Sequence, residues 1–394
     1  MANVSSSNGL EKRPKLRFPG FDESYRTTPL GEIASLVNRT DPKSNAPIMM
    51  LSAGNGFIMQ SEKYSRDNAG QSLKKYILLK QGELAYNHGA SKAKQFGCCY
   101  ELTEPEARIP YVYHCFKIND HEYTPFIAMA LNNAKMDKQL KRLVSSSVRM
   151  DGLLNISFED YMSVTLHLPS STEQKHIADF LKKIDERIAA QEKLLASLKK
   201  YKRGLVKALI SGTMAFACSE NKRWETVRLA EIFTISAGGD IDRQNSSPTY
   251  STSYPYPVYA NALTNNGLYG YANYFKVEGD SITVSGRGEV GHAIARHCKY
   301  VPIVRLLSLV PKYEDDVDFF AYMINATSIY IESTGVPQLT SPQLGAVKVF
   351  RPPILEQKRI SSLLLKIDAK IENEERLTFY LEKIRSSMLQ QLFI

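Results

Sequence analysis

The chain of 394 residues is 43% hydrophobic, which is enough to bury two cores of ordinary domain size. Its formal net charge of +9 favours an acidic partner, with nucleic acid as the first candidate. Five cysteines, an odd number, argue against a disulfide framework, and the lack of a signal peptide and of a long apolar stretch argues against secretion and membrane insertion. We therefore expect a cytoplasmic protein with two cores.

The chain starts with a polar segment, residues 1–24, that we expect to be a disordered tail. A first globular block follows at residues 25–168, with the mixed pattern of an α/β domain. Its expected elements are, in order, a strand-like opening at residues 30–33, a turn at Gly82-Glu83, a small-residue loop at residues 86–89, a short helix at residues 126–132 and a closing strand at residues 161–166.

A long central helix is predicted over residues 169–212. It starts after Pro169, because proline is tolerated only in the first turn, and Ser170 with Glu173 fits a capping box. Its apolar residues recur alternately three and four positions apart, which is the narrow seam of a coiled coil. They are Ile177, Leu181, Ile184, Ile188, Leu195, Leu198, Leu205 and Leu209.

A second globular block, residues 213–351, shares little sequence with the first but has corresponding landmarks. These are a strand-like opening at residues 229–232, a turn at Gly279-Asp280, a loop at residues 285–288, a short helix at residues 319–325 and a closing strand at residues 344–349. The block is also rich in tyrosine and asparagine, which suit the recognition of polar surfaces, although a tyrosine-rich core explains any single tyrosine better. The tyrosines are Tyr250, Tyr254, Tyr256, Tyr259, Tyr269, Tyr271 and Tyr274.

The last segment, residues 352–394, repeats the central helix at a constant offset of 183 residues. Such a repeat sets the architecture, which is one block and one long helix, made twice. The residues of the first copy that recur unchanged are Pro169, Glu173, Gln174, Lys175, Ile177, Leu181, Lys183, Ile184, Asp185, Ile188, Glu192, Leu194, Leu198, Lys200 and Leu209.

Each helix needs a partner for its apolar seam, and the other copy in the same chain is the simplest one. We expect an antiparallel pair that acts as a spacer of roughly 60 Å between the two blocks, at about 1.5 Å per residue. Polar residues interrupt the seam at equivalent places, Gln191 with Glu374 and Lys202 with Arg385. They either fix the register of the pair or face solvent where it splays, and the sequence leaves both interpretations open.

The basic end of the central helix also has two interpretations. Its cations suit a nucleic acid or an acidic partner, but they also lie where positive charge favours a helix C-terminus, and the second interpretation is slightly preferred. They are Lys199, Lys200, Lys202, Arg203 and Lys207.

Motifs for catalysis and cofactors are weak. Residues 286–291 match the dinucleotide pattern G-x-G-x-x-G, but no sustained helix period follows them, so phosphate or guanine contact suits this loop better. Glu173-Gln174-Lys175 resembles the end of a nuclease site but fits helix capping and packing better. No cysteine pair has metal-ligand spacing backed by histidines, and His88, His292 and His297 are isolated. We expect no catalytic site, no cofactor and no metal.

The chain resembles the specificity (S) subunits of type I restriction–modification systems. The shared features are the helix header P-x-x-x-E-Q-x-x-I in both copies, the entry Arg17-Phe18-Pro19-Gly20-Phe21, the Leu-Gly-Glu-Ile-like openings, the loop at residues 267–271 and the stretch at residues 334–338. Residues 145–149 parallel that last stretch only loosely.

The resemblance implies that each block is a target recognition domain that reads one half of a split, asymmetric site on double-stranded DNA. It implies that the paired helices set the spacing of the half-sites and dock two methyltransferase subunits. Adenine methylation and ATP-dependent translocation and cleavage then belong to partner methyltransferase and restriction subunits, and this chain is not an enzyme.

The family layout places DNA contacts in three loops of each block: after the opening element, after the Gly-acid turn and before the closing strand. In the first block the expected contacts are Arg39, Thr40, Asn87, His88, Lys92 and Arg149. In the second block they are Ser236, Asp240, Arg243, Asn265, Tyr269, Arg287 and Gln338.

Two other functions compete with this one. The first is a DNA-binding or scaffold protein outside restriction, in which the coiled coil joins two chains. The second is a DNA methyltransferase, which needs a cofactor fold and a catalytic motif that the sequence does not display.

Overall fold

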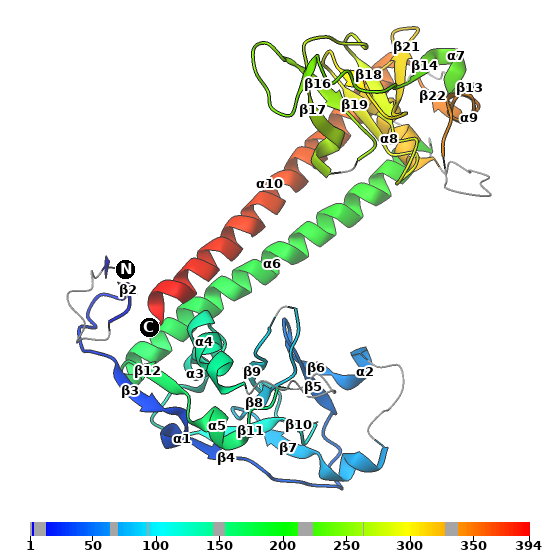
Figure 1. Cartoon of the computed structure of the whole chain (residues 1–394). Helices are drawn as coiled ribbons and strands as arrows, with labels where there is room; N and C mark the ends of the chain where they lie inside the picture. The colour runs from blue at the N-terminus through cyan, green and yellow to red at the C-terminus, as the bar shows by residue number, and fades with distance from the viewer. Residues whose placement is uncertain are drawn as a thin grey trace. The chain divides into compact units, whose positions relative to one another are not determined.

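The computed structural model describes residues 2–3, 13–63, 70–92, 94–144, 154–211, 224–262, 264–327 and 338–394 (Figure 1). Contacts within the chain divide it into two compact units. Unit 1 comprises Met1–Gln191 together with Leu377–Ile394, and unit 2 comprises Glu192–Arg376. Each unit therefore holds one globular block and a part of both long helices.

Unit 1 is built on a four-stranded antiparallel sheet in the order β4-β11-β8-β9. Gly82 turns the chain into this sheet at φ +81°, a conformation that only glycine adopts without steric strain. Leu84, Phe116 and Phe126 are fully buried in the core on one face of the sheet. The elements of this layer are β4 (Ala34–Leu36), β8 (Leu84–Asn87), β9 (Cys98–Glu101), β11 (His114–Ile118), α3 (Thr124–Ala130) and α4 (Ala134–Leu143).

A second layer covers the other face of the same sheet. Successive strand residues point to opposite faces, so Ala85 and Cys115 join a separate apolar core with Leu79 and Ile109. The layer consists of β5 (Met49–Ser52), β6 (Gly56–Met59), α2 (Gln60–Lys63), η1 (Gly70–Lys75), β7 (Ile77–Lys80) and β10 (Glu106–Ile109). Near the start of the chain, β1 (Ala2–Asn3) pairs with β2 (Leu16–Arg17).

Three of the five cysteines are free and buried in unit 1, namely Cys98, Cys99 and Cys115. Burial raises the pKa of Cys98 to about 11, so its thiol stays protonated at neutral pH. Cys298 of unit 2 is also free. The cysteines in the described ranges are therefore free thiols, and the three of unit 1 are core residues.

Unit 2 repeats the sheet of unit 1, with the strand order β14-β21-β18-β19. Gly279, at φ +97°, turns the chain into β18 as Gly82 does into β8. The predicted helix at residues 319–325 and the predicted Gly-acid turn are both confirmed. The elements are β14 (Phe233–Ala237), β18 (Ser281–Val284), β19 (Ala293–Arg296), β21 (Leu307–Pro311) and α8 (Val317–Ala326).

The second layer of unit 2 differs from that of unit 1. It is a sheet in the order β15-β17-β16-β20, with a small core that includes Val258 and Ile303. Polar side chains are buried beside it: Tyr300 hydrogen-bonds to Ser281 and Ser308. The elements are β15 (Ser246–Ser247), β16 (Tyr256–Tyr259), η2 (Thr264–Gly267), β17 (Leu268–Ala272) and β20 (Val301–Pro302).

The opening elements differ from the prediction. The strands expected at residues 30–33 and 229–232 are short helices, α1 (Leu30–Ile33) and α7 (Leu229–Ile232). Leu30 and Ile33 are both buried, and residues three apart share a helix face but lie on opposite faces of a strand. The helical form therefore buries both side chains at once.

The closing strands were predicted a few residues too early. Residues 158–162 and 341–345 form the helices α5 (Phe158–Met162) and α9 (Ser341–Gly345), each started by a capping box. The strands β12 (Thr165–Leu168) and β22 (Lys348–Arg351) follow and pair with β3 (Arg26–Pro29) and β13 (Glu225–Arg228). As predicted, both closing strands lead directly into a long helix.

The long helices are α6 (Ser171–Ile210) and α10 (Ile354–Leu392), and their pairing is antiparallel. In unit 1 the start of α6, at Ile177 and Leu181, shares a core with Leu392. In unit 2 the end of α6, at Leu209, shares a core with the start of α10 at Ile360. The mixed α/β fold with an antiparallel helix pair is thus confirmed.

Two of the polar seam residues form ion pairs between the two long helices. Lys202 pairs with Asp368 in unit 2, and Arg385 pairs with Asp185 in unit 1. Each residue of one pair lies 183 positions from its counterpart in the other, so the repeat generates the same contact twice. Gln191, another seam position, is 2% exposed. Gln191 is thus buried, whereas the side chains of the two ion pairs join the helices and stay partly exposed.

No helix in the described part of the chain is both long and apolar enough to span a bilayer.

Candidate functional site

Loops at one end of the main sheet of unit 2 converge on Gly286. Its backbone N–H donates to Asn261 Oδ1 at 2.8 Å, and its carbonyl accepts from Leu339 N–H at 2.9 Å. A side chain at Gly286 would meet the carbonyl oxygen of Arg305 at 2.8 Å, so only glycine fits between these loops. The loops after β18, before β21 and before α9 therefore form one packed surface.

Two arginines and a glutamine lie at the centre of this surface, and we call them the arginine cluster. Arg287 donates to Gln338 Oε1 from Nε at 3.3 Å and from Nη2 at 3.1 Å. Arg305 donates to the same oxygen from Nη1 at 3.0 Å. Both arginines are exposed and Gln338 is partly exposed. The predicted contacts Arg287 and Gln338 are thus brought together, with Arg305 as a third member.

The backbone that carries Arg305 is held in an uncommon conformation. Val304 and Arg305 have φ +50° and +65°, in the left-handed region that β-branched and bulky residues avoid. Backbone hydrogen bonds of 2.9 Å from Val304 N–H to Gly239 O and from Arg305 N–H to Gly238 O hold the turn. The strain is thus offset by the loop after β14, and it keeps the arginine in place.

The other expected contacts of unit 2 lie on neighbouring loops. Ser236, on β14, and Asp240 and Arg243, in the loop after it, are exposed. Asn265 has φ +51° in η2, and Tyr269, on β17, is 61% exposed. In the described part of unit 2, none of these five residues hydrogen-bonds to the arginine cluster, and their role in binding stays a prediction.

A buried arginine braces the loop that carries Asn265. Arg296 is 7% exposed, donates to Asn266 O at 2.7 Å and lies over the Tyr259 ring, with its guanidinium carbon 3.6 Å from the ring centre. Burial lowers the pKa of Arg296 below its ordinary value. This arginine therefore supports the loop rather than forming part of its surface.

In unit 1 the equivalent loop follows β8. Leu154 N–H donates to His88 O at 2.9 Å, as Leu339 does to Gly286. His88 is 7% exposed and packs in an aromatic group with His114 and Tyr86, so its ring faces inward. Asn87 accepts a 2.9 Å hydrogen bond from Gly89 N–H and so shapes the loop.

The remaining predictions for unit 1 have different surroundings. Arg39 forms a bidentate pair with the buried Glu83, at 3.2 and 3.0 Å, and also donates to Leu78 O. Its hydrogen bonds to Glu83 raise the pKa of Arg39 above its ordinary value, and its guanidinium is largely used within the fold. Thr40 and Lys92 are exposed, whereas Arg149 lies outside the described residues.

The Glu-Gln pairs at the starts of the long helices have structural partners. Glu173 is fully buried and accepts from Arg17 at 2.8 and 2.7 Å, while Glu356 accepts from Trp224 Nε1 at 3.0 Å. Ser170 accepts from Glu173 N–H at 3.4 Å, but the Glu173 carboxylate binds Arg17, so the predicted capping box is only half formed. Packing against the adjacent block is confirmed as their role.

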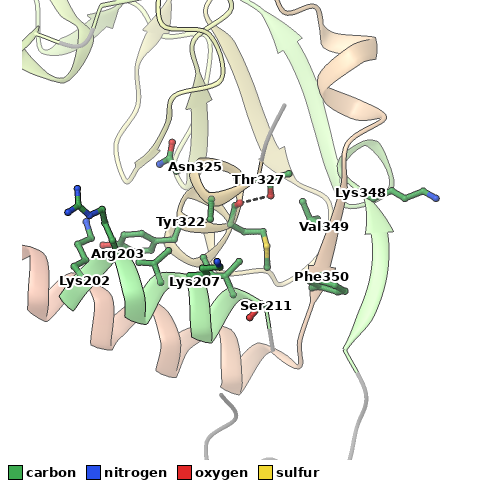
Figure 2. Close-up of a pocket in the computed structure, with 14 residues that line it drawn as sticks. Lys202, Arg203, Lys207, Ser211, Tyr322, Asn325, Thr327, Lys348, Val349 and Phe350 are labelled. Carbon is green, nitrogen blue, oxygen red and sulfur yellow. Dashed lines mark hydrogen bonds between the residues drawn. The ribbon is translucent and has the colours of Figure 1, made fainter. Parts of the chain in front are cut away.

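A cavity of about 740 Å³ lies beside the basic end of α6 in unit 2 (Figure 2). Arg203 and Lys207 line it above apolar side chains such as Val206 and Met323. Lys202, which also lines the cavity, is paired with Asp368, and Lys199 is paired with Glu375 of the other helix. Part of the basic end thus forms ion pairs with the other long helix. The cations that line the cavity beside apolar side chains also suit an acidic partner.

The exposed side chains of the arginine cluster offer hydrogen-bond donors. The loop at residues 286–291 joins β18 to β19 and has no helix after it, which is unlike a dinucleotide fingerprint. In the ranges that the structure covers, no three side chains of His, Cys, Asp or Glu are placed to hold a metal ion. Exposed guanidinium and amide donors suit the acceptor groups of a polyanion.

Sequence reasoning missed Arg305 and Asn261. Arg305 follows a valine in a run that reads as a strand, and its left-handed backbone leaves no glycine or proline signal. Asn261 is one of several asparagines in its region, and only the fold shows that it bridges Gly286 N–H and Val304 O.

Comparison with known proteins places this arrangement in a family. A family model described as "Type I restriction modification DNA specificity domain" matches residues 74–200 and 221–383. A curated type I specificity subunit of Mycoplasma pneumoniae is 28% identical over 51% of this chain and 54% of its own length, and a second one from that organism is 30% identical over 37% and 42%. The chain spans about half the length of these curated relatives.

Solved structures share the fold at low sequence identity. The S subunit of a type I restriction–modification system from M. genitalium aligns over 97% of this chain and 99% of its own, with a TM-score of 0.62 and 16% identity. A chain from a structural study of complex assembly and conformational transition in the type I R–M system aligns over 95% and 98%, with a TM-score of 0.57 and 15% identity.

Proposed function

The chain belongs to the family of type I restriction–modification DNA specificity domains, and we propose that it directs such a complex to an asymmetric, two-part DNA target. In this proposal unit 1 reads one half of the target and unit 2 reads the other. Methylation of adenine and ATP-dependent cleavage are carried out by partner methyltransferase and restriction subunits.

The observation that supports the proposal most is that both units share one sheet topology but differ in their surface loops. Both units have a four-stranded sheet with the same strand order, and a helix (α3 in unit 1, α8 in unit 2) packs on one face of it. Their second layers and loops differ. A shared frame with different loops suits two readers of different sequences. A target with two unlike halves follows from this difference.

The proposal assigns the long helices two tasks. Their register is fixed by the pairs Lys202–Asp368 and Arg385–Asp185, which suits a spacer of constant length between the half-sites. On the part of α10 that belongs to unit 1, Phe379, Tyr380 and Ile384 are 52%, 54% and 46% exposed. Exposed apolar side chains at this density favour a protein partner, and we assign them to the docking of a methyltransferase subunit.

The test is to express the chain with a methyltransferase subunit in a host and to sequence the modified bases of the host DNA. We expect modified adenines in both halves of a split motif, and no such motif in cells that lack this chain. The methyltransferase subunit alone is the matched control. Identical methylation with and without the chain would refute the proposal.

Two further measurements separate the rival functions. Light scattering on the purified chain should give one copy per particle if α6 pairs with α10 of the same chain, and two copies if the coiled coil joins two chains. Incubation of the chain alone with labelled S-adenosylmethionine and DNA should transfer no label. Transfer by the chain alone would make it a methyltransferase.

A further inference from the structure

The arginine cluster presents hydrogen-bond donors and no free strong acceptor. Arginine can only donate, so the Gln338 atom that faces both guanidinium groups must be the oxygen, and the amide NH₂ is its remaining polar group. Arg287 uses its Nε–Nη2 edge for this contact and Arg305 uses Nη1. Within the described residues, the other side-chain N–H groups of both arginines have no hydrogen-bond partner and can bind a ligand.

Among the described residues of unit 2, the two positive charges are held together without a carboxylate partner. In the described part of unit 2, neither Arg287 nor Arg305 takes part in an ion pair, whereas Arg351 and Lys358 of the same unit each have an acidic partner. Like charges this close repel each other, and an electron-rich ligand relieves the repulsion. The cluster is thus built for an acceptor that comes from outside the chain.

The donors are also fixed in position before any ligand binds. Asn261 ties the loop of Arg287 to that of Arg305, since it accepts from Gly286 N–H and donates to Val304 O. Leu339, next to Gln338, is hydrogen-bonded to Gly286 O at 2.9 Å. A recognition group that is held in this way loses little freedom on binding and tolerates few alternative ligands.

The bases differ in what they offer to such a surface. In the major groove guanine displays two acceptors, N7 and O6, whereas adenine displays one acceptor and one donor, and cytosine a donor. Glutamine can read adenine only if its oxygen is free to accept from the adenine amino group. Here that oxygen is already used by two arginines, so the pattern of donors fits guanine.

We propose that Arg305, with Arg287 and Gln338, is a specificity-determining contact of unit 2 that requires a guanine in the half-site this unit reads. The inference rests on the proposed function, which assigns DNA reading to unit 2. It adds a residue, the identity of the base and a reason why adenine is rejected at that position.

The test uses the complex with the methyltransferase subunit and compares the wild type with Arg305→Ala and Arg305→Lys. Once the wild-type motif is known, binding is measured on duplexes that carry each of the four bases at every position of both half-sites. We expect Arg305→Ala to lose discrimination by about tenfold or more at one guanine position only. Arg305→Lys, which retains one donor group, should lose less. Arg228→Ala, at an exposed arginine of unit 2 outside the cluster, is the matched control and should leave the motif unchanged.

A second variant protects the test against misfolding. Gln338→Glu should form ion pairs with both arginines, which keeps the loops together but occupies the donors, so it should relax the same position as Arg305→Ala.

If Arg305→Ala weakens binding equally on all duplexes, the cluster contacts phosphate and the proposal is wrong. A relaxed position that is not a G·C pair refutes the choice of guanine. The absence of any motif in the wild type refutes the proposed function itself, which is a separate result.

Discussion

At the scale of single residues, the same glutamate of the repeat is satisfied in two ways. Glu173 and Glu356 occupy equivalent positions, yet the first binds the arginine Arg17 and the second binds the indole of Trp224. A buried ion pair contributes little net stability when intact, but the loss of one partner leaves an uncompensated buried charge. The two units should therefore respond differently to changes at this position.

We predict that Arg17→Met strongly destabilises unit 1. The Arg17 side chain is 4% exposed and that of Glu173 is fully buried, so the change should cost about 3–5 kcal/mol. The free energy of unfolding of unit 1 is measured in a urea series, with hydrogen exchange in peptides of unit 1 as the readout. Lys358→Met, which removes an exposed pair with Glu314, is the control and should cost less than about 1 kcal/mol. Equal effects of the two variants would contradict the prediction.

Unit 2 should carry a pH-dependent contact at His297. This histidine lies between Asp280 at 2.9 Å and Asp318 at 3.1 Å. Burial acts to lower the pKa of His297, but the hydrogen bonds and charges of the two aspartates outweigh it and raise the pKa above its ordinary value of 6.5. The stabilisation is therefore complete below pH 6.5 and is lost as the pH rises through the higher pKa of the folded state.

His297→Gln should consequently destabilise unit 2 at pH 6 and have little effect at pH 9. The site is half exposed, so the difference should stay below about 1 kcal/mol. Thermal unfolding at the two pH values measures it, with His121→Gln in unit 1 as the control for the loss of a histidine. A variant whose effect does not depend on pH would show that His297 acts by packing alone.

At the scale of elements, the helix pair combines an apolar seam with charges that specify its register. Asp185 and Arg385 meet in unit 1, and Lys202 and Asp368 meet in unit 2. We predict that Asp185→Lys destabilises the pair by on the order of 1 kcal/mol, because it sets two cations against each other. Combining it with Arg385→Glu should restore most of the loss.

A double-mutant cycle in urea measures this coupling. Lys370→Ala, which breaks a pair with Glu374 within one helix, is the control and should show no coupling to Asp185→Lys. Additive effects of the two charge reversals would mean that the Asp185–Arg385 contact does not stabilise the pairing.

The long helices and the mixed frame could be predicted from the sequence, because both leave periodic signals. The seam of α6 repeats over 40 residues, and the Gly-acid turns at Gly82 and Gly279 mark the strands that follow them. The opening elements could not be predicted correctly. A segment of four residues such as Leu30–Ile33 fits a strand or a helix equally well, and only its packing in the fold decides between them. The second layers consist of strands of two to five residues, too short to show a period.

The candidate site could be predicted only in part, for a related reason. The loop of Arg287 and the residue Gln338 could be predicted because glycines and turn residues lie next to them in the sequence. Arg39 and His88 have equally suitable side chains, but one is bound to Glu83 and the other is buried, which only tertiary packing decides. A sequence indicates which side chains are able to bind DNA, and the fold determines which of them are available.

At the scale of the whole molecule, the proposed spacer can be tested by changing the length of the helices. Seven residues, one heptad, inserted after Lys193 in α6 and after Arg376 in α10 would keep the seam and lengthen both helices by about 10 Å. These positions are 183 residues apart and thus equivalent in the repeat. We expect the gap between the half-sites to grow by about three base pairs, at about 3.4 Å per pair, while the half-sites stay the same.

Sequencing of the modified bases measures the gap. An insertion in α6 alone is the control, because it shifts the seam against an unchanged partner and should abolish methylation. An unchanged gap after the double insertion would show that the helices do not set the spacing.

Unit 1 is interrupted in the sequence by the whole of unit 2, and this has a consequence for how the protein is made. Leu392 and Phe393 are 0% and 3% exposed in the core of unit 1, where Phe393 stacks on Phe126 and its carbonyl accepts from Lys135. A ribosome synthesises these two residues after every residue of unit 2. Unit 1 is thus the first unit to start and the last to be completed during translation. An mRNA truncated within the second half of the coding sequence yields a unit 1 that lacks Leu392 and Phe393 and has an incomplete core.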